Sequence, residues 1–278
     1  MAIFGTVGTF VRYIPLPSAT IAFCRGLMGL MFLLAVMALT GKRPEKEAIR
    51  QNLKILLLSG AAIGGNWILL FEAYRYTTVA TATICYYLAP MILVLASPLL
   101  GERLTGRKLL LSGAALLGMF FVSGVLQGGV SGGRGIALGV GAAVLYASVM
   151  ILNKKLGPIS AYDKTVIQLG AAAAVILPYC ILSRGFDMSQ MTAMGYVLLV
   201  VVGILHTGFA YWLYFGAMKQ LPSQSVAIFS YLDPVIAIIL SAVLLKEPFG
   251  WQEVLGAALI LGSALCSELP AQKIAKKG

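Results

Sequence analysis

The chain has 278 residues, of which 59% are hydrophobic and 11% are charged, and its formal net charge is +11. Soluble domains have about 25% charged residues, so this composition excludes a water-soluble fold of this size. Apolar runs of about 20 residues, the length that crosses a bilayer, recur along the whole sequence. The sequence therefore predicts an all-α polytopic membrane protein. Because the basic residues lie between these runs, the net charge does not indicate a nucleic-acid partner.

The apolar runs predict ten membrane spans. In chain order they cover about residues 2–12, 18–39, 53–74, 78–98, 106–125, 135–153, 161–183, 193–218, 222–245 and 250–268. Glycine and proline residues punctuate the segments between them, as expected for turns. The first run is short, because eleven residues at 1.5 Å per residue cover only about 16 Å. We therefore expect either that helix 1 is incomplete here or that the true start lies upstream of Met1.

Lysine and arginine residues orient the bundle, because they concentrate in cytoplasmic loops. With the N-terminus placed in the cytoplasm, the inner loops and the C-terminal tail hold 15 of these residues and the outer loops hold 5, while Arg25 lies within the second span. This bias predicts that both termini are cytoplasmic. For a bacterial chain, we expect a multi-pass protein of the inner membrane.

An internal repeat appears when the sequence is shifted by 144 positions. Residues 64–118 and 208–262 then match at 16 of 55 positions without gaps. A Tyr-Leu-x-Pro motif falls on a second copy, so that Pro90 corresponds to Pro234. Small residues spaced by four also match (Ala114, Gly118, Ala258 and Gly262), and such pairs let helices approach closely. The pair formed by Gly60 and Gly64 has the same spacing.

The repeat divides the chain into two five-span units. We expect repeats over residues 1–126 and 135–268, joined by a glycine-rich linker at 127–134 and followed by a basic cytoplasmic tail at 269–278. Because five is odd, the second unit must enter the membrane from the opposite side. Inverted repeats of this kind are typical of secondary transporters, whose substrate sites lie near the midplane at the repeat interface.

Four motifs stand out in the first half: Gly5-Thr-Val-Gly-Thr-Phe-Val-Arg12, Phe23-Cys-Arg-Gly26, Tyr86-Tyr-Leu-Ala-Pro90 and Leu99-Leu-Gly-Glu-Arg-Leu-Thr105. These motifs resemble those of the EamA family of the drug/metabolite transporter superfamily. The resemblance extends over both halves. It implies ten helices in two inverted repeats, alternating access, and export of amino acids or other small metabolites. The chain departs from the pattern in its short first helix, and it has Asp233 where the matching first-half position is Ala89.

The most unusual residues of the spans are Asp233 and the prolines Pro90 and Pro234. A charged side chain at the bilayer centre costs at least about 2.5–3.5 kcal/mol, and proline frees a backbone carbonyl. Both features are tolerated where a helix lines a watery cavity. We interpret the prolines as helix breaks or hinges, and Asp233 as a partner for a cationic group or a proton carrier. The competing interpretations are a plain kink and a buried, hydrogen-bonded carboxyl group.

Three further ionisable residues lie within spans. His206, the only histidine, falls at a depth similar to that of Asp233, where it can line the cavity, relay a proton or simply pack. Arg25 and Glu72 lie toward the outer ends of the second and third spans. We interpret these two as a structural pair or an outer gate.

Aromatic and amide side chains at mid-depth complete the predicted site. An interfacial belt does not explain aromatic residues so far from the membrane surface, so they either pack in the core or line an aromatic cavity. The predicted substrate-binding residues are Asn66, Trp67, Tyr86, Tyr87, Tyr146, Gln168, His206, Tyr211, Tyr231 and Asp233.

Other function classes fit the sequence less well. An enzyme would need a metal cluster or a nucleophile with a base, and a channel would need repeated pore rings, so we predict neither an enzyme nor a cofactor. The expected partners are a small-molecule substrate, the lipid bilayer and, as one option for the coupling ion, the proton. The sequence favours a monomer. The leading hypothesis is amino-acid export, and the alternative is transport of organic cations by Asp233 and an aromatic box.

Overall fold

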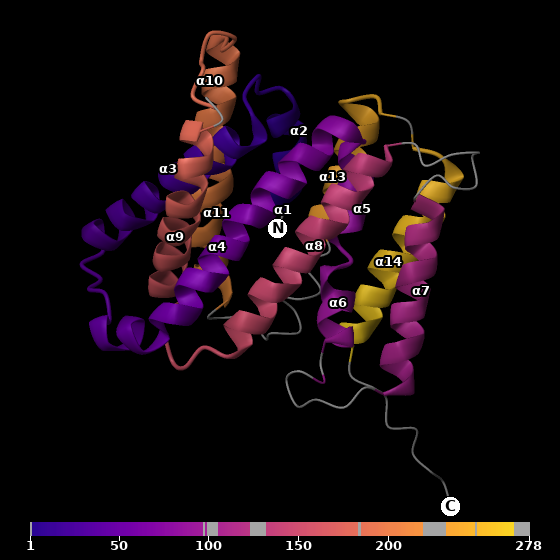
Figure 1. Ribbon diagram of the computed structural model, residues 1–278, viewed down its shortest axis with the longest axis horizontal. Helices are drawn as coiled ribbons and strands as arrows, with labels where there is room; N and C mark the ends of the chain where they lie inside the picture. Colours follow the sequence, from indigo (N-terminus) through magenta and orange to yellow (C-terminus); the bar gives the residue numbers. More distant parts are fainter. Residues whose placement is uncertain are drawn as a thin grey trace, which may run out of the picture.

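The structure is a computed structural model that describes residues 2–96, 98, 105–122, 132–182, 185–218, 232–247 and 249–269. Apart from turns and loops, the elements in these ranges are helices, as predicted (Figure 1). Five helical stretches of the described residues are long and apolar enough to cross a membrane: Ser18–Leu39, Lys46–Tyr76, Gly133–Lys154, Ala161–Leu182 and Ala193–Tyr214.

The elements of the described residues match the ten predicted spans one to one. The first half consists of α1 (Ala2–Gly5) with α2 (Val7–Arg12), α3 (Ser18–Leu39), α4 (Lys46–Tyr76), α5 (Val79–Tyr86) with α6 (Ala89–Leu95), and α7 (Gly106–Val122). The second half consists of α8 (Gly133–Lys154), α9 (Ala161–Leu182), α10 (Ala193–Val200) with the π-helix η3 (Val201–Phe209) and α11 (Ala210–Met218), α13 (Leu232–Val243), and α14 (Trp251–Glu268). The predicted ten-helix fold is therefore confirmed.

The fourth span is broken in the middle. Helix α5 begins where the Thr78 hydroxyl accepts a hydrogen bond from the Thr81 backbone N–H at 3.0 Å, and it ends at Tyr86. Helix α6 begins at Ala89, after the two intervening residues Tyr87 and Leu88, with Pro90 in its first turn. Proline is tolerated there because the first turn of a helix does not need its N–H group. The break therefore falls at the proline that the sequence singled out.

Several helix contacts recur when the two halves are exchanged. Helix α3 packs on η3, and correspondingly α9 packs on α4. Helix α8 packs on α5 and α6, just as α1 and α2 pack on α13. Three other pairs, α3 with α9, α5 with α13 and α7 with α14, join equivalent helices of the two halves. The extensive contact of α4 with α8 has only a slight counterpart, between η3 and the short helices α1 and α2. This pattern is the one expected for two inverted five-helix repeats.

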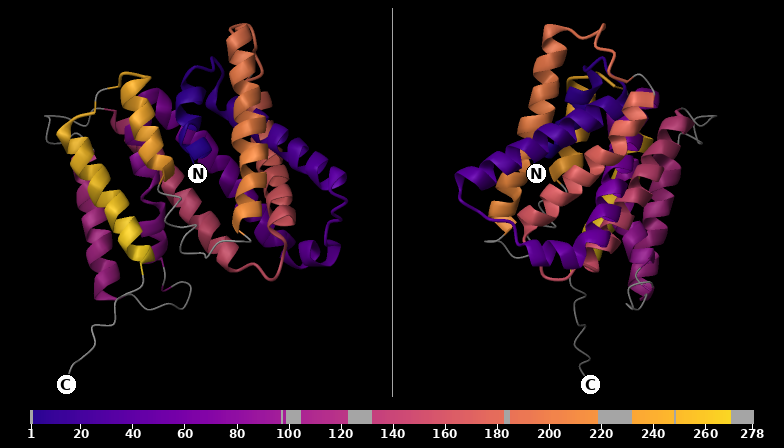
Figure 2. Two further views of the ribbon diagram at one scale, coloured as in Figure 1. Left: turned by 180° about the vertical axis from the view of Figure 1, so that it is seen from behind. Right: turned by 60° about the vertical axis from the view of Figure 1, so that its left-hand side comes forward.

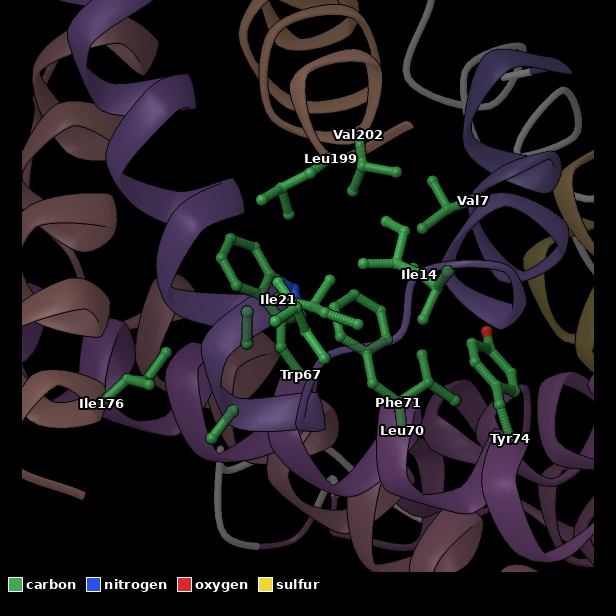
Figure 3. Packing of buried hydrophobic residues seen from close by; sticks show 14 of the residues in the cluster. Val7, Ile14, Ile21, Trp67, Leu70, Phe71, Tyr74, Ile176, Leu199 and Val202 are labelled. Atoms are coloured by element: carbon green, nitrogen blue, oxygen red, sulfur yellow. The ribbon is translucent and has the colours of Figure 1, made fainter. Parts of the chain in front are cut away.

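The core is divided between two clusters of buried side chains. One lies among α2, α3, α4 and η3 and includes Ile21, Trp67, Phe71 and Val202 (Figure 3). The other joins α5, α6, α7, α8 and α14 around residues such as Ile84 and Ile260. Helices α7 and α14 lie side by side at one end of the molecule, while α3 and α10 lie toward the other end (Figures 1 and 2).

Glycine contacts between α7 and α14 differ in one respect from the sequence-based expectation. Gly118 does mark a close approach, but its counterpart is Gly256, where a Cβ atom would lie 2.6 Å from the Gly118 backbone oxygen. At Gly262 a Cβ atom would meet nothing within 4 Å. The expected close approach at Gly262 is therefore wrong, because the rotation of α14 turns that position away from α7.

One acidic residue ties the second half to the start of α5. Glu247 accepts hydrogen bonds through Oε2 from the Val79 backbone N–H at 2.8 Å and from the Ser241 hydroxyl at 2.5 Å. Its Oε1 lies 3.9 Å from Nη2 of Arg12. A carboxylate at a helix N-terminus satisfies an unpaired N–H group and interacts favourably with the helix dipole. Glu247 thus joins α5, the end of α13 and α2.

Replacement of Glu247 should weaken this junction. We expect Glu247→Gln to destabilise the protein by about 1 kcal/mol, because the amide keeps an acceptor oxygen but loses the charge at the helix N-terminus. Glu247→Ala should cost about 2 kcal/mol, since it removes the cap entirely. Thermal unfolding in detergent measures both effects. An unchanged melting temperature for Glu247→Ala would contradict the assigned role.

Candidate substrate-binding site

The carboxylate of Asp233 meets the break between α5 and α6. Tyr87, which lies in that break, donates its hydroxyl hydrogen bond to Oδ2 of Asp233 at 2.8 Å. Asp233 lies in the first turn of α13 beside the buried Pro234. Helix α1 packs closely on the same turn, since a Cβ atom on Gly5 would lie 2.5 Å from the Asp233 backbone oxygen. The two matched spans, each marked by a proline, are therefore joined at this hydrogen bond.

Aromatic rings extend from this hydrogen bond toward α8 and α11. Tyr86 stacks on Tyr146 of α8 with 5.2 Å between ring centroids, and its ring meets the edge of Tyr87 at 5.9 Å. Tyr211 of α11 packs against Phe4 of α1 at 5.6 Å. Tyr86, Tyr146 and Tyr211 all lie near enough to Asp233 for its charge to act on their hydroxyl groups. Four of the predicted residues, all tyrosines, are thus grouped around the Asp233 carboxylate. A fifth predicted tyrosine, Tyr231, lies outside the described residues.

His206 lies in the π-helix η3 and is 1% exposed. Its Nε2 atom is 2.6 Å from the Thr6 hydroxyl, and its Nδ1 atom is 3.1 Å from the Val201 carbonyl. The ring packs against Phe10, with 4.9 Å between centroids. Short π-helical turns occur frequently at functional sites. The sequence predicted the depth of His206 but not the π-helical turn or its contact with Thr6.

Arg25 is buried between α3, α4 and η3. Its Nε atom donates to the Thr207 hydroxyl at 2.8 Å. The guanidinium carbon lies 4.4 Å from the centroid of the Trp67 ring and 5.6 Å from that of Phe71. Arg25 also interacts with Tyr211. The predicted residue Trp67 therefore meets this arginine through its ring face, which is the geometry of a cation–π contact.

The structure does not join Arg25 to Glu72. Glu72 accepts a hydrogen bond from the Ser18 hydroxyl at 2.6 Å, and its Oε2 atom is 3.8 Å from Nη1 of Arg75. The two residues were paired from their similar depth, but depth does not determine which way a side chain points around a helix. Their direct pairing is therefore wrong in this conformation, whereas a gating role for either residue stays a prediction.

Asn66 and Gln168 hold helices together. The Asn66 side chain donates from Nδ2 to the Ala142 carbonyl of α8 at 2.7 Å. Gln168 donates from Nε2 to the Ser59 hydroxyl and to Oδ1 of Asn153, both at 2.7 Å. Hydrogen bonds of this kind between membrane helices are typically worth about 0.6–2 kcal/mol. Both side chains are buried, and their predicted contact with substrate remains untested.

A cavity of about 320 Å³ lies where the α2–α3 connection meets the end of α4. Its walls include Arg12, Ser18, Ile21, Phe71, Tyr74 and Arg75. This volume is at the lower end of the range for small-molecule pockets. Ile14 also lines the cavity, and Figure 3 shows Ile14, Ile21, Phe71 and Tyr74 in the same part of the buried cluster. Because Phe71 also lies near the Arg25 guanidinium, the floor of the cavity is close to the buried arginine.

Two threonines that hold the central side chains are not among the residues predicted from the sequence. Thr6 contacts His206, and Thr207 contacts Arg25. Their signal in the sequence is weak, because threonine is common in apolar helices and often bonds its own backbone. Within the described ranges, no group of three or more His, Cys, Asp and Glu residues is arranged to hold a metal ion.

Comparison with known proteins identifies the family. The model of the EamA-like transporter family matches residues 1–124 and 133–268, which is nearly the whole chain. The chain belongs to the EamA-like transporter family. It is therefore a multi-pass membrane transporter, and the predicted family, transporter class and fold class are confirmed.

EamA-like relatives align over most of this chain. "Uncharacterized transporter YxxF" of Bacillus subtilis (strain 168) is 30% identical over 251 residues, which cover 87% of this chain and 78% of the relative. "Protein RarD" of Salmonella typhi is 25% identical over 251 residues, covering 88% and 83%. A protein of known crystal structure superposes with a TM-score of 0.66 at 21% identity, covering 94% of this chain and 92% of the other. That structure supports the same fold.

Proposed function

We propose that this EamA-like transporter exports amino acids or related small metabolites by alternating access through a central, aromatic-lined site. The observation that carries the proposal is the hydrogen bond between Tyr87 and Asp233. It joins the matched proline-marked spans of the two halves, which is where repeat-built transporters bind their substrates. The surrounding tyrosines supply apolar surface with few polar groups, as small-molecule sites usually do.

The arrangement in the membrane is part of the proposal. The bias of lysine and arginine residues supports cytoplasmic positions for both termini in a bacterial inner membrane. The repeats at 1–126 and 135–268 would then rock against each other, with the segment at 127–134 as linker and 269–278 as a cytoplasmic tail. Asp233 and His206 are the candidates for carrying a coupling proton, since both are ionisable residues within spans.

A second candidate function is the transport of organic cations. It is favoured by the grouping of Tyr86, Tyr87 and Tyr146 near Asp233, because aromatic faces and a carboxylate together suit a cation. Such a substrate needs no partner for a negative group. Buried Arg25, whose charge acts on the same site, therefore favours the amino-acid proposal over this one.

Counterflow into proteoliposomes tests the two candidates. Purified protein is reconstituted and given a panel of amino acids and organic amines, with and without an imposed pH gradient. We expect saturable uptake of amino acids, and faster uptake in the presence of the gradient if protons are coupled. Uptake of amines alone would replace the first candidate with the second. No uptake of either class by folded protein would contradict both.

A further inference from the structure

A buried positive charge lies near Asp233 without a carboxylate of its own. Arg25 is 6% exposed, and none of the described Asp and Glu residues forms an ion pair with it. Its contacts are neutral groups: the Thr207 hydroxyl, the ring faces of Trp67 and Phe71, and Tyr211. Buried charges in proteins are normally paired, because their desolvation is costly. Arg25 therefore has no carboxylate within ion-pair distance among the described residues, although the charge of Asp233 acts on it.

The surroundings of Arg25 hold its guanidinium group in one orientation. The bond from Nε to Thr207 defines the direction of the group, and stacking on Trp67 restrains its plane. Thr207 is itself held, because its hydroxyl also donates to the Val202 carbonyl within the π-helix at 3.0 Å. A guanidinium fixed in this way presents its donors in the fork that matches a carboxylate. Preorganisation of this kind is typical of a binding group.

Arg25 and Asp233 act on the same group of aromatic residues with opposite charges. The charge of Arg25 interacts with Tyr86, Tyr211 and Asp233, and Asp233 interacts with the same two tyrosines. The site therefore holds a positive and a negative group that both act on the same aromatic residues. An α-amino acid carries the complementary pair of charges, a carboxylate and an ammonium group.

We propose that Arg25 binds the carboxylate of the transported molecule while Asp233 holds its ammonium group. This inference rests on the proposed amino-acid export and narrows the substrate class to zwitterions with a free carboxylate. The cavity at the end of α4 lies close to Arg25, because Phe71 both lines that cavity and has its ring centroid 5.6 Å from the guanidinium carbon. Movement of the Phe71 side chain would connect the two.

Transport of matched substrates tests the inference. The amino acid with the fastest counterflow is compared with its methyl ester, which keeps the ammonium group but has no carboxylate charge. We expect the wild type to prefer the free acid by about 10-fold or more, the scale of a charge-assisted contact. Arg25→Gln should lose this preference through slower transport of the acid, and Arg25→Lys should keep part of it. An undiminished preference in Arg25→Gln would overturn the inference.

The matched control is Arg134→Gln. Arg134 also lies over an aromatic ring, with its guanidinium carbon 4.1 Å from the centroid of Tyr76, but it is exposed. Its replacement should leave the preference for the acid unchanged. If Arg134→Gln loses the preference to the same extent as Arg25→Gln, the loss is a general effect of removing an arginine. That result would overturn the assignment of Arg25 as the carboxylate-binding residue.

A binding measurement separates this inference from the proposed function. The chain has three tryptophans, so Trp212→Phe with Trp251→Phe leaves Trp67, which lies against Arg25, as the only reporter. Free amino acids should change its fluorescence saturably, their amides should not, and Arg25→Gln should abolish the response. No response from folded protein would overturn the inference even if amino acids are transported. A response without counterflow would uphold carboxylate binding and contradict the proposed export.

Discussion

The Asp233→Asn variant should fold normally and lose most of its transport. In the wild type, the Tyr87 hydroxyl donates a hydrogen bond to Oδ2 of Asp233 at 2.8 Å. Asparagine keeps an oxygen that can accept this hydrogen bond, so the junction between the two halves is preserved. The negative charge is lost, and with it the group proposed to hold an ammonium ion or a proton. Because contacts to charged groups are worth about 1.5–3 kcal/mol, we expect counterflow to fall by at least about 10-fold.

Two further variants make this result specific. Tyr87→Phe removes the hydrogen bond but keeps the charge, so it should reduce transport less than Asp233→Asn does. Asp187→Asn is the matched surface control, because Asp187 is exposed and its carboxylate has local hydrogen bonds with Ser189, including one from the backbone N–H at 2.9 Å. It should leave counterflow unchanged. Normal transport with a normal response to the pH gradient in Asp233→Asn would contradict the role assigned to Asp233.

The second large effect is expected at the interface between α4 and α9. A Cβ atom on Gly60 would lie 2.6 Å from the Gln168 backbone oxygen and 2.6 Å from the Cβ atom of Ala171. Neither atom can move without displacing α9. Overpacking of this kind costs about 1–3 kcal/mol, so Gly60→Ala should lower the melting temperature by about 4–8 °C.

Replacement of Gly113 by alanine, in contrast, should not lower the melting temperature. Gly113 lies in α7, where a Cβ atom would meet nothing within 4 Å. Alanine is favoured over glycine in a helix by about 1 kcal/mol, so Gly113→Ala should leave the melting temperature unchanged or raise it. Thermal unfolding followed by size-exclusion chromatography in detergent compares the two variants. Equal shifts in the same direction would show that the close approach at Gly60 does not determine stability.

Part of the candidate site could be anticipated from the sequence. The match of one Tyr-Leu-x-Pro motif to another brought Tyr87, Pro90 and Pro234 to attention, and the structure joins Tyr87 to Asp233, the neighbour of Pro234. These residues could be recognised from the sequence because a proline or an acidic residue within a membrane span raises the free energy of the span, whatever its neighbours are. Such residues can therefore be recognised in the sequence before their neighbours in the fold are known. Whether they bind substrate is a separate question that the proposed variants address.

Other parts of the site depended on how the helices are rotated. Asn66 and Gln168 were grouped with the aromatic residues because all of them lie at mid-depth, but the structure turns their amides toward α8 and α4. Arg25 was paired with Glu72 for the same reason, whereas η3 brings Thr207 to it instead. Depth follows from counting residues along a span. Direction follows from the packing of each helix on its neighbours.

The sequence by itself determined the class of the protein, the positions of its spans and the relation between its halves. Each of these depends on local hydropathy or on a repeat that is visible in one dimension. Only the tertiary structure decided which polar groups meet: Asp233 with Tyr87, His206 with Thr6, and Arg25 with Thr207. In an apolar bundle a polar side chain bonds whichever partner the helix contacts bring within about 3 Å, and these contacts form between residues that are far apart along the chain.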